Sequence, residues 1–138
     1  MADYYEELDH TGDLAISVSG RDLAEVFRHA ALALFALLVE GDGTEEQTRG
    51  VRVRGQDRED LLHEWLSRLL SDFYAEGFVV TDVPMITIGD RELEATVAGH
   101  RFRSGRDRLL REIKAVTYHG LTLRAGKNGW EARITFDV

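Results

Sequence analysis

Two aspartates near opposite ends of the sequence are the residues best suited to bind a ligand. Asp13 closes the segment Asp-His-Thr-Gly-Asp, and Asp137 lies next to Val138 in the final strand-like segment. Because that strand runs to the last residues, the main-chain oxygen of Val138 is expected to be fixed as well. Two carboxylates and a fixed main-chain oxygen suit a hard cation such as calcium, magnesium or manganese. A second interpretation is that Asp13 is a turn residue and Asp137 a solvated strand-end residue.

Three further side chains, of His10, Lys114 and His119, are candidates for a functional role. His10 lies three residues before Asp13, which is near enough to share a site. Lys114 lies in the strand predicted over residues 112–118, and His119 follows that strand and precedes Gly120, which is expected to turn the chain. A histidine at such a turn can act as a general acid or base. The alternative is a turn histidine whose ring nitrogens are satisfied by neighbouring groups.

Two helices are predicted from apolar residues at helical spacing. The first covers residues 22–40: Asp22 is a suitable N-cap, Glu25 completes a capping box, and Gly41 is expected to end the helix. The second begins at Asp57 or Arg58 and ends at Gly77. Its broad apolar face consists of Leu61, Leu62, Trp65, Leu66, Leu69, Leu70 and Phe73.

The rest of the sequence is rich in predicted strands. They cover residues 14–19, 51–54, 78–81, 85–88, 92–97, 112–118, 121–124 and 130–137, and Asn128-Gly129 is a hairpin signal. In the last strand the apolar residues share one face, so Asp137 falls on the face away from the core. The pattern predicts an α+β fold, in which two amphipathic helices pack on a mostly antiparallel sheet as one layered domain, residues 1–138.

Composition narrows the class of protein. A chain of 138 residues with 43% hydrophobic and 30% charged residues is typical of one soluble globular domain. The absence of cysteine excludes disulfides, cysteine zinc sites and thiol nucleophiles. The acidic N-terminal segment is not typical of a signal peptide, and no apolar run is long enough to span a membrane. We therefore expect a cytoplasmic location and no membrane partner.

The net charge of −8 argues against a stand-alone nucleic-acid binder, because phosphate binding normally needs a basic field. The bases are concentrated in the second half of the chain, above all between Arg101 and Lys114. That stretch is either a solvated loop with local ion pairs or a small basic patch for phosphate or an acidic partner. Phosphate-binding loops, dinucleotide fingerprints and nucleophile elbows are missing from the sequence.

Four segments in the correct order resemble the motifs of the archease family. The residues that carry the resemblance are Tyr5 to Asp13, Leu61 to Leu66, Glu112 to His119, and Gly129 to Val138. The Lys-Ala-Val-Thr-Tyr-His block, together with the two aspartate segments, is the most specific part. The departures are small: Gly12 stands where alanine is common, and residues 101–110 match no family pattern.

The resemblance implies an accessory protein rather than an enzyme. Archeases bind a divalent metal and assist a GTP-dependent RNA-splicing ligase. They promote guanylylation of the active-site histidine of the ligase and allow the ligase multiple turnovers. The resemblance therefore implies that GTP and RNA are bound by the ligase and not by the archease alone. The family's metal site corresponds to Asp13, Asp137 and Val138, with calcium favoured and Lys114 placed near it. Two alternatives stay open: a chaperone-like partner of an RNA methyltransferase, and a metal-dependent phosphoesterase.

Overall fold

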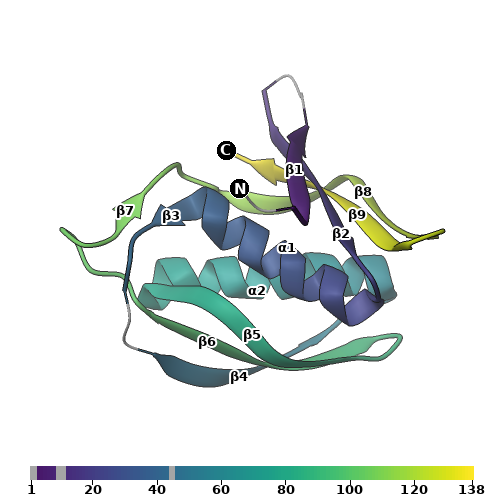
Figure 1. Ribbon diagram of the computed structural model, residues 1–138, viewed down its shortest axis with the longest axis horizontal. Coiled ribbons are helices and arrows are strands. Elements are labelled where there is room, and N and C mark those ends of the chain that lie inside the picture. Colours follow the sequence, from purple (N-terminus) through teal and green to yellow (C-terminus); the bar gives the residue numbers. More distant parts are fainter. Residues whose placement is uncertain (1–2, 9–11, 44–45) are drawn as a thin grey trace.

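Both helices lie between two antiparallel sheets, as Figure 1 shows for the computed structural model. The structure describes residues 3–8, 12–43 and 46–138. The helices are α1 (Leu23–Leu38) and α2 (Arg58–Glu76). Each helix packs against strands of both larger sheets. The predicted α+β class, with two helices on antiparallel strands, is confirmed.

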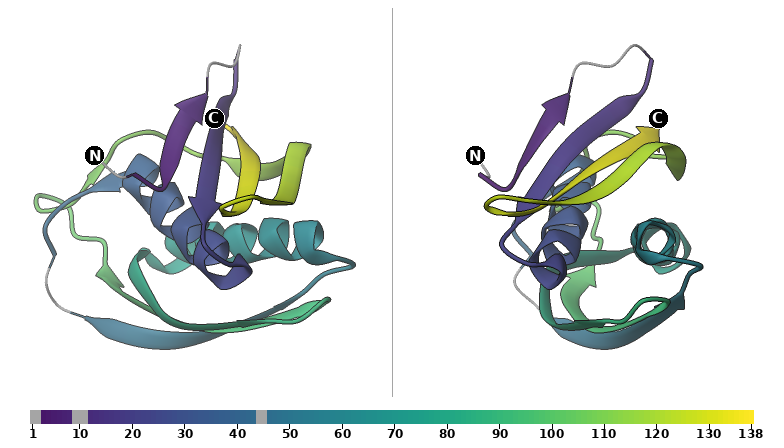
Figure 2. Two further views of the ribbon diagram at one scale, coloured as in Figure 1. Left: turned by 45° about the vertical axis from the view of Figure 1, so that its right-hand side comes forward. Right: turned by 90° about the vertical axis from the view of Figure 1, so that its right-hand side faces the viewer.

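The described strands form three sheets rather than the one sheet predicted. A four-stranded sheet has the order β1 (Tyr5–Leu8), β2 (Leu14–Gly20), β9 (Gly129–Asp137), β8 (Ala115–Gly126). A three-stranded sheet has the order β4 (Gln47–Arg54), β6 (Glu92–Arg101), β5 (Phe78–Ile88). The short strands β3 (Val39–Glu40) and β7 (Arg108–Leu109) pair with each other. The two larger sheets lie on opposite sides of the helices in both views of Figure 2.

The helix limits agree with the local signals, with one correction. Asp22 accepts from the N–H of Glu25 at 2.8 Å, and Asp57 caps α2 in the same way. Gly77 ends α2 in the left-handed conformation, with φ of 73°. The prediction that α1 runs to residue 40 and ends at Gly41 was wrong. Helix α1 ends at Leu38, because Val39 is extended and pairs with Leu109 of β7.

Several strands begin or end at other residues than predicted, because their limits depend on pairing with residues that are distant in the sequence. Strand β1 was not predicted, because its sequence is acidic and does not alternate clearly. Residues 112–114 were predicted to be extended but precede β8. The two predicted strands 78–81 and 85–88 form one strand with irregular pairing between Val80 and Met85. Likewise, β8 continues through His119 and Gly120, with irregular pairing between Thr117 and Thr122.

The apolar faces of the helices and sheets meet in one buried cluster. Its largest side chain is Trp65, which is fully buried and donates from Nε1 to the Phe27 carbonyl at 2.9 Å. This bond joins the middle of α2 to α1 and satisfies the indole N–H that burial would otherwise leave unpaired. Phe136 and Ile16 enter the same cluster from neighbouring strands. The core therefore fixes the sheet that carries both ends of the sequence.

No helix within the described parts of the chain is both long and apolar enough to span a bilayer.

Candidate functional site

Strands β2 and β9 bring Asp13 and Asp137 to the same end of the four-stranded sheet. The two strands are antiparallel, and the last pair of their register joins Leu14 to Phe136. Asp13 precedes Leu14 and Asp137 follows Phe136, so the two aspartates stand one step beyond that pair on neighbouring strands. Both are exposed. Both views of Figure 2 show the C-terminus, at the end of β9, near β2.

The burial pattern of β9 places Asp137 on the outer face of the sheet. Ile134 and Phe136 are fully buried and face the helices, while Asp137 is exposed on the other side. Its neighbour on β8 is Ala115, whose small side chain leaves the carboxylate uncovered on that side. The predicted direction of Asp137, away from the core, is confirmed.

Lys114 lies at the same end of the sheet, directly before β8. Its backbone N–H donates to the Asp137 carbonyl at 2.7 Å, one step beyond the pair of Ala115 with Asp137. Lys114 is exposed, and so is Val138, which is 41% exposed. We call Asp13, Asp137, Val138 and Lys114 the strand-end site. His10 lies outside the described residues.

A group of side chains fixes the irregular part of β8 to α2. The Tyr118 ring stacks on the His63 ring with centroids 3.7 Å apart, and its hydroxyl donates to Asp60 Oδ1 at 2.8 Å. His63 Nε2 lies 2.8 Å from the Val116 carbonyl oxygen. These contacts position the following residue, His119, which is exposed and whose N–H donates to Thr117 Oγ1 at 3.3 Å.

The same contacts change the acidity of two groups. The hydrogen bond to Asp60, with partial burial and nearby carboxylates, raises the pKa of Tyr118 to about 12. The Gln56 N–H and then the Tyr118 hydroxyl hydrogen-bond Asp60 and lower the pKa of its carboxyl. At neutral pH the phenol is therefore protonated and serves as a hydrogen-bond donor, not as a base.

The donors at the strand-end site suit a hard cation that keeps part of its water shell. Magnesium is often held by one or two carboxylates with waters and substrate phosphates, while calcium takes six to eight oxygens. Among the described residues there is no group of three or more histidine, aspartate or glutamate side chains placed to hold a metal. An ion here would therefore rest on two carboxylates, main-chain oxygen and water. Exposure of both carboxylates leaves room for that water.

A second polar cluster, which no sequence pattern indicated, is buried beside β7. Asp107 has a fully buried side chain and accepts from the Arg103 N–H at 2.8 Å and from Arg106 at 2.9 Å. His100 Nε2 lies 3.5 Å from its other oxygen. Burial pushes the pKa of Asp107 upward, but the hydrogen bonds and charges of its neighbours outweigh burial and lower it. The cluster holds residues 101–109 in place.

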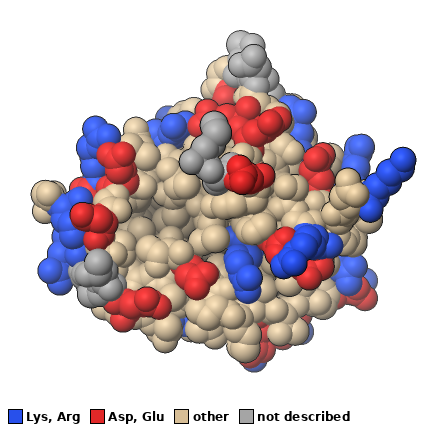
Figure 3. Space-filling model, in the orientation of Figure 1, with Lys and Arg blue, Asp and Glu red and all other residues tan. Residues whose placement is uncertain are grey.

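The predicted basic stretch is a folded loop with local ion pairs rather than one continuous patch. Arg108 pairs with Glu40 at 2.7 Å, and Arg111 lies 3.7 Å from Glu7. On the face seen in Figure 3, the described acidic and basic side chains alternate in small groups. Such exposed pairs contribute little to stability, at most about 1 kcal/mol each.

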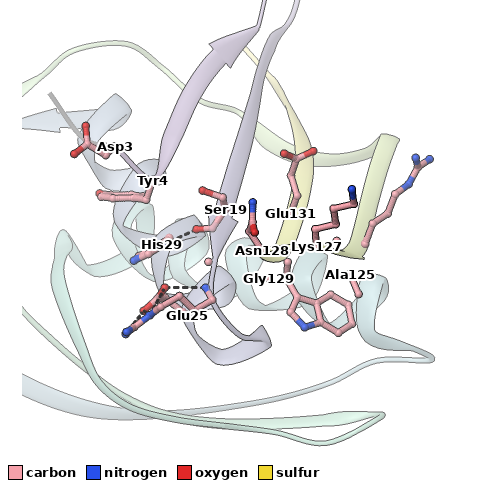
Figure 4. A pocket seen from close by; sticks show the side chains of 15 residues that line it. Asp3, Tyr4, Ser19, Glu25, His29, Ala125, Lys127, Asn128, Gly129 and Glu131 are labelled. Atoms are coloured by element: carbon pink, nitrogen blue, oxygen red, sulfur yellow. Dashed lines mark hydrogen bonds and ion pairs between the residues drawn. The ribbon is translucent and has the colours of Figure 1, made fainter.

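A hollow of about 840 Å³ lies between the start of α1 and the β8–β9 hairpin, as Figure 4 shows. On one wall His29 Nδ1 lies 2.7 Å from the Ser19 carbonyl oxygen, and its ring stacks on Tyr4 with centroids 4.4 Å apart. On the same wall Glu25 pairs with Arg21 at 2.9 Å. His29 is half-buried at the edge of the core.

Comparison with known proteins gives consistent results over almost the full chain. The model of the Archease protein family matches residues 5–138. Protein archease of Methanosarcina acetivorans is 34% identical over 97% of this chain and 95% of its own length. Protein archease of Archaeoglobus fulgidus is 33% identical over 97% of this chain and 98% of its own.

Two solved structures share the fold. The solution structure of Methanobacterium thermoautotrophicum protein 1598 has a TM-score of 0.78 and 29% identity, over 98% of this chain and 99% of that one. The crystal structure of a Thermotoga maritima archease, described as a possible chaperone, has a TM-score of 0.65 and 24% identity, over 96% of each chain. The second likeness bears on the fold alone. Together with the family match, these results show that the chain belongs to the archease family.

Proposed function

We propose that this protein is an accessory activator of a GTP-dependent RNA-splicing ligase, and that it works through a divalent cation at the strand-end site. The observation that supports this best is the register of β2 with β9. The pairing of Leu14 with Phe136 brings together two carboxylates that are more than 120 residues apart in sequence. Membership of the archease family supports the choice of partner.

In this proposal Asp13 and Asp137 hold the cation, and a main-chain oxygen of Val138 completes the protein's share of its ligands. Calcium, magnesium and manganese all accept such oxygen donors. When bound, the cation would supply positive charge that stabilises phosphate oxygens during phosphoryl transfer. The Lys114 ammonium group would add a second positive charge at the same exposed end, because its backbone is anchored to Asp137.

The rest of the chain positions this end for docking on the ligase. Its net charge of −8 favours association with a basic, RNA-binding partner, and such attraction mainly raises the association rate. The exposed strand ends would enter the nucleotide pocket of the ligase, where the cation and Lys114 organise the GTP phosphates for attack by the ligase histidine. GTP and RNA meet this protein only in the complex. The protein itself acts as a non-catalytic activator.

A guanylylation assay tests the proposal. Purified ligase is incubated with radiolabelled GTP, with and without this protein, and covalent nucleotide on the ligase is counted. We expect stimulation by the wild type and its loss with Asp13→Asn or Asp137→Asn. The matched control is Asp90→Asn, which removes a charge from an aspartate that is 91% exposed at the β5–β6 turn and should stimulate normally. Stimulation by all three variants at the wild-type level would refute the role of the strand-end site.

Two further measurements separate this function from other activities. Binding of calcium, magnesium or manganese to the isolated protein should weaken in the Asp137→Asn variant whatever the ligase assay shows. A 2′,3′-cyclic phosphate incubated with the protein alone should remain intact. Its hydrolysis would favour a phosphoesterase instead.

A further inference from the structure

A groove on the outer face of the four-stranded sheet has features of a ligand site that are separate from the strand-end site. It has a volume of about 610 Å³ and lies across all four strands. Alternate residues of the strands point into it, because every second side chain faces away from the helices. We call it the outer groove; its polar lining consists of Glu6, Ser17, Thr122, Arg124, Glu131 and Arg133.

Arg124 and Arg133 form no ion pair with any described residue. Elsewhere most arginines of this acidic protein have a carboxylate within 4.0 Å, including Arg21, Arg52 and Arg108. Glu131 is directly opposite Arg124 in the register of β8 with β9, yet the two side chains do not pair. Two exposed guanidinium groups in one groove are thus available to an anion. Arginine's planar group of donors suits the oxygens of phosphate.

Thr135 provides a second and independent observation. It lies on the outer face between Arg133 and Asp137, is 1% exposed, and its Oγ1 has no hydrogen-bond partner within the described chain. A buried hydroxyl without a partner is unfavourable by roughly 1–3 kcal/mol. Such a group in a folded protein indicates a hydrogen-bond partner from outside the chain, such as a water molecule or a ligand.

Gly120 leaves open the space that this partner would occupy. Its φ of +66° favours glycine, and a Cβ built on it would lie 3.9 Å from Arg133 Nε and 3.9 Å from Thr135 Oγ1. Both polar atoms therefore border the position that a side chain at Gly120 would occupy, in the irregular part of β8. A phosphate oxygen placed there could accept from the guanidinium group and from the hydroxyl.

The two carboxylates of the groove indicate more than a phosphate group. Glu6 and Glu131 form no ion pair with described residues, and both line the groove that holds the two arginines. Carboxylates accept hydrogen bonds from sugar hydroxyls but repel phosphate, so a ligand with both groups would satisfy the whole lining. Ser17 and Thr122 add hydroxyls that can donate or accept. A ribose carrying a phosphate has this combination of groups.

We propose that the outer groove binds a ribose phosphate, with the phosphate on Arg133, Arg124 and Thr135 and the ribose hydroxyls on Glu131 and Glu6. The site goes beyond the proposed ligase function and does not depend on it, because none of these residues belongs to the strand-end site. The ribose phosphate could belong to a free nucleotide or to the end of an RNA strand. Both sources share the chemistry that the groove recognises.

The test follows amide and arginine Nε signals of the full chain by NMR during titration with ribose 5-phosphate, inorganic phosphate and ribose. We expect ribose 5-phosphate to shift the signals of Ser17, Thr122 and Arg133, and to bind more tightly than either half alone. Arg133→Gln should weaken binding at least tenfold, since it removes charged hydrogen bonds. Thr135→Val should weaken binding without lowering the melting temperature. The matched control, Arg91→Gln, removes an exposed arginine at the β5–β6 turn and should bind normally.

Glu131→Gln separates a ribose phosphate site from a simple anion site. The variant should bind inorganic phosphate more tightly, because a repelling charge is gone, and ribose 5-phosphate more weakly. Tighter binding of both ligands would overturn the proposal, as would equal binding by Arg133→Gln and wild type. Titration with guanosine 5′-monophosphate and with a short RNA bearing a terminal phosphate then distinguishes the two sources. If the groove binds but ligase stimulation fails, the proposed function fails alone; if stimulation occurs without binding, this inference fails alone.

Discussion

The backbone N–H of Lys114 donates a 2.7 Å hydrogen bond to the carbonyl oxygen of Asp137. This bond ties the segment before β8 to the end of β9, while β2 places Asp13 on the other side of β9. Three segments far apart in sequence thus meet at one exposed end of a sheet whose opposite face is packed on the helices. A small change at that end should therefore alter ligand binding without disturbing the core.

A divalent cation should stabilise the folded protein through the strand-end site. A ligand that binds only the folded state at 100 times its Kd adds about 2.7 kcal/mol. We expect calcium, magnesium or manganese in such excess to raise the melting temperature of the wild type, and a chelator to reverse the rise. In Asp137→Asn the rise should vanish while the metal-free melting temperature stays the same. An equal rise in wild type and variant would show that the cation binds elsewhere.

Asp107 should be far more important for stability than an exposed aspartate that also pairs with arginine. Replacing it with asparagine leaves Arg106 and the Arg103 N–H without their charged partner in a buried setting, which typically costs about 3–5 kcal/mol. Asp90 pairs with Arg58 at 3.2 Å but is 91% exposed, so Asp90→Asn should cost less than about 1 kcal/mol. Urea unfolding of both variants measures the difference. Similar losses would mean that the buried cluster contributes no more than a surface pair.

The lowered pKa of Asp107 also fixes the direction of a pH effect. A carboxyl whose pKa is lower in the folded state stabilises the protein above its unfolded pKa, and that stability is lost as the pH falls through the folded value. Wild type should therefore lose part of its free energy of unfolding below about pH 4. Asp107→Asn should lose less over the same range. An identical acid profile for the two proteins would contradict the assignment.

Tyr118 should titrate at unusually high pH because its hydroxyl donates to Asp60. Its pKa is raised to about 12, so the hydrogen bond persists near pH 10 and is lost as the pH rises toward 12. The tyrosinate absorbance of wild type minus that of Tyr118→Phe isolates this residue from the other tyrosines. In Asp60→Asn the midpoint should move down toward the ordinary value near 10. No movement of the midpoint would show that another group raises it.

Two glycines in the three-stranded sheet should respond very differently to alanine. A Cβ at Gly99 would lie 1.9 Å from the Val79 carbonyl oxygen, so the backbone of β5 would have to move. Gly99→Ala should therefore lower the free energy of unfolding by about 2 kcal/mol or more. Gly50 has no neighbour within 4 Å of such a Cβ, and Gly50→Ala should be neutral or slightly stabilising. Equal stability of the two variants, measured by urea unfolding, would contradict the close packing of β5 on β6.

The sequence by itself determined the elements whose signals are local. The caps Asp22 and Asp57, the left-handed Gly77 and the apolar faces of both helices are encoded within a few residues of each position. The alternation of β9 also predicted that Asp137 faces away from the core. Such signals are readable because helix spacing and strand alternation depend only on the backbone geometry of one segment.

Only the tertiary structure decided which segments meet. Helix α1 ends two residues earlier than predicted because Val39 pairs with Leu109, and β1 forms because it pairs with β2. The pairing of Leu14 with Phe136, which brings the two aspartates together, joins opposite ends of the chain. The buried contact of His100 with Asp107 depends on how residues 101–109 fold back, and no pattern in those residues indicated it. Strand pairing and burial are set by the free energy of the whole packed core, which no short segment encodes alone.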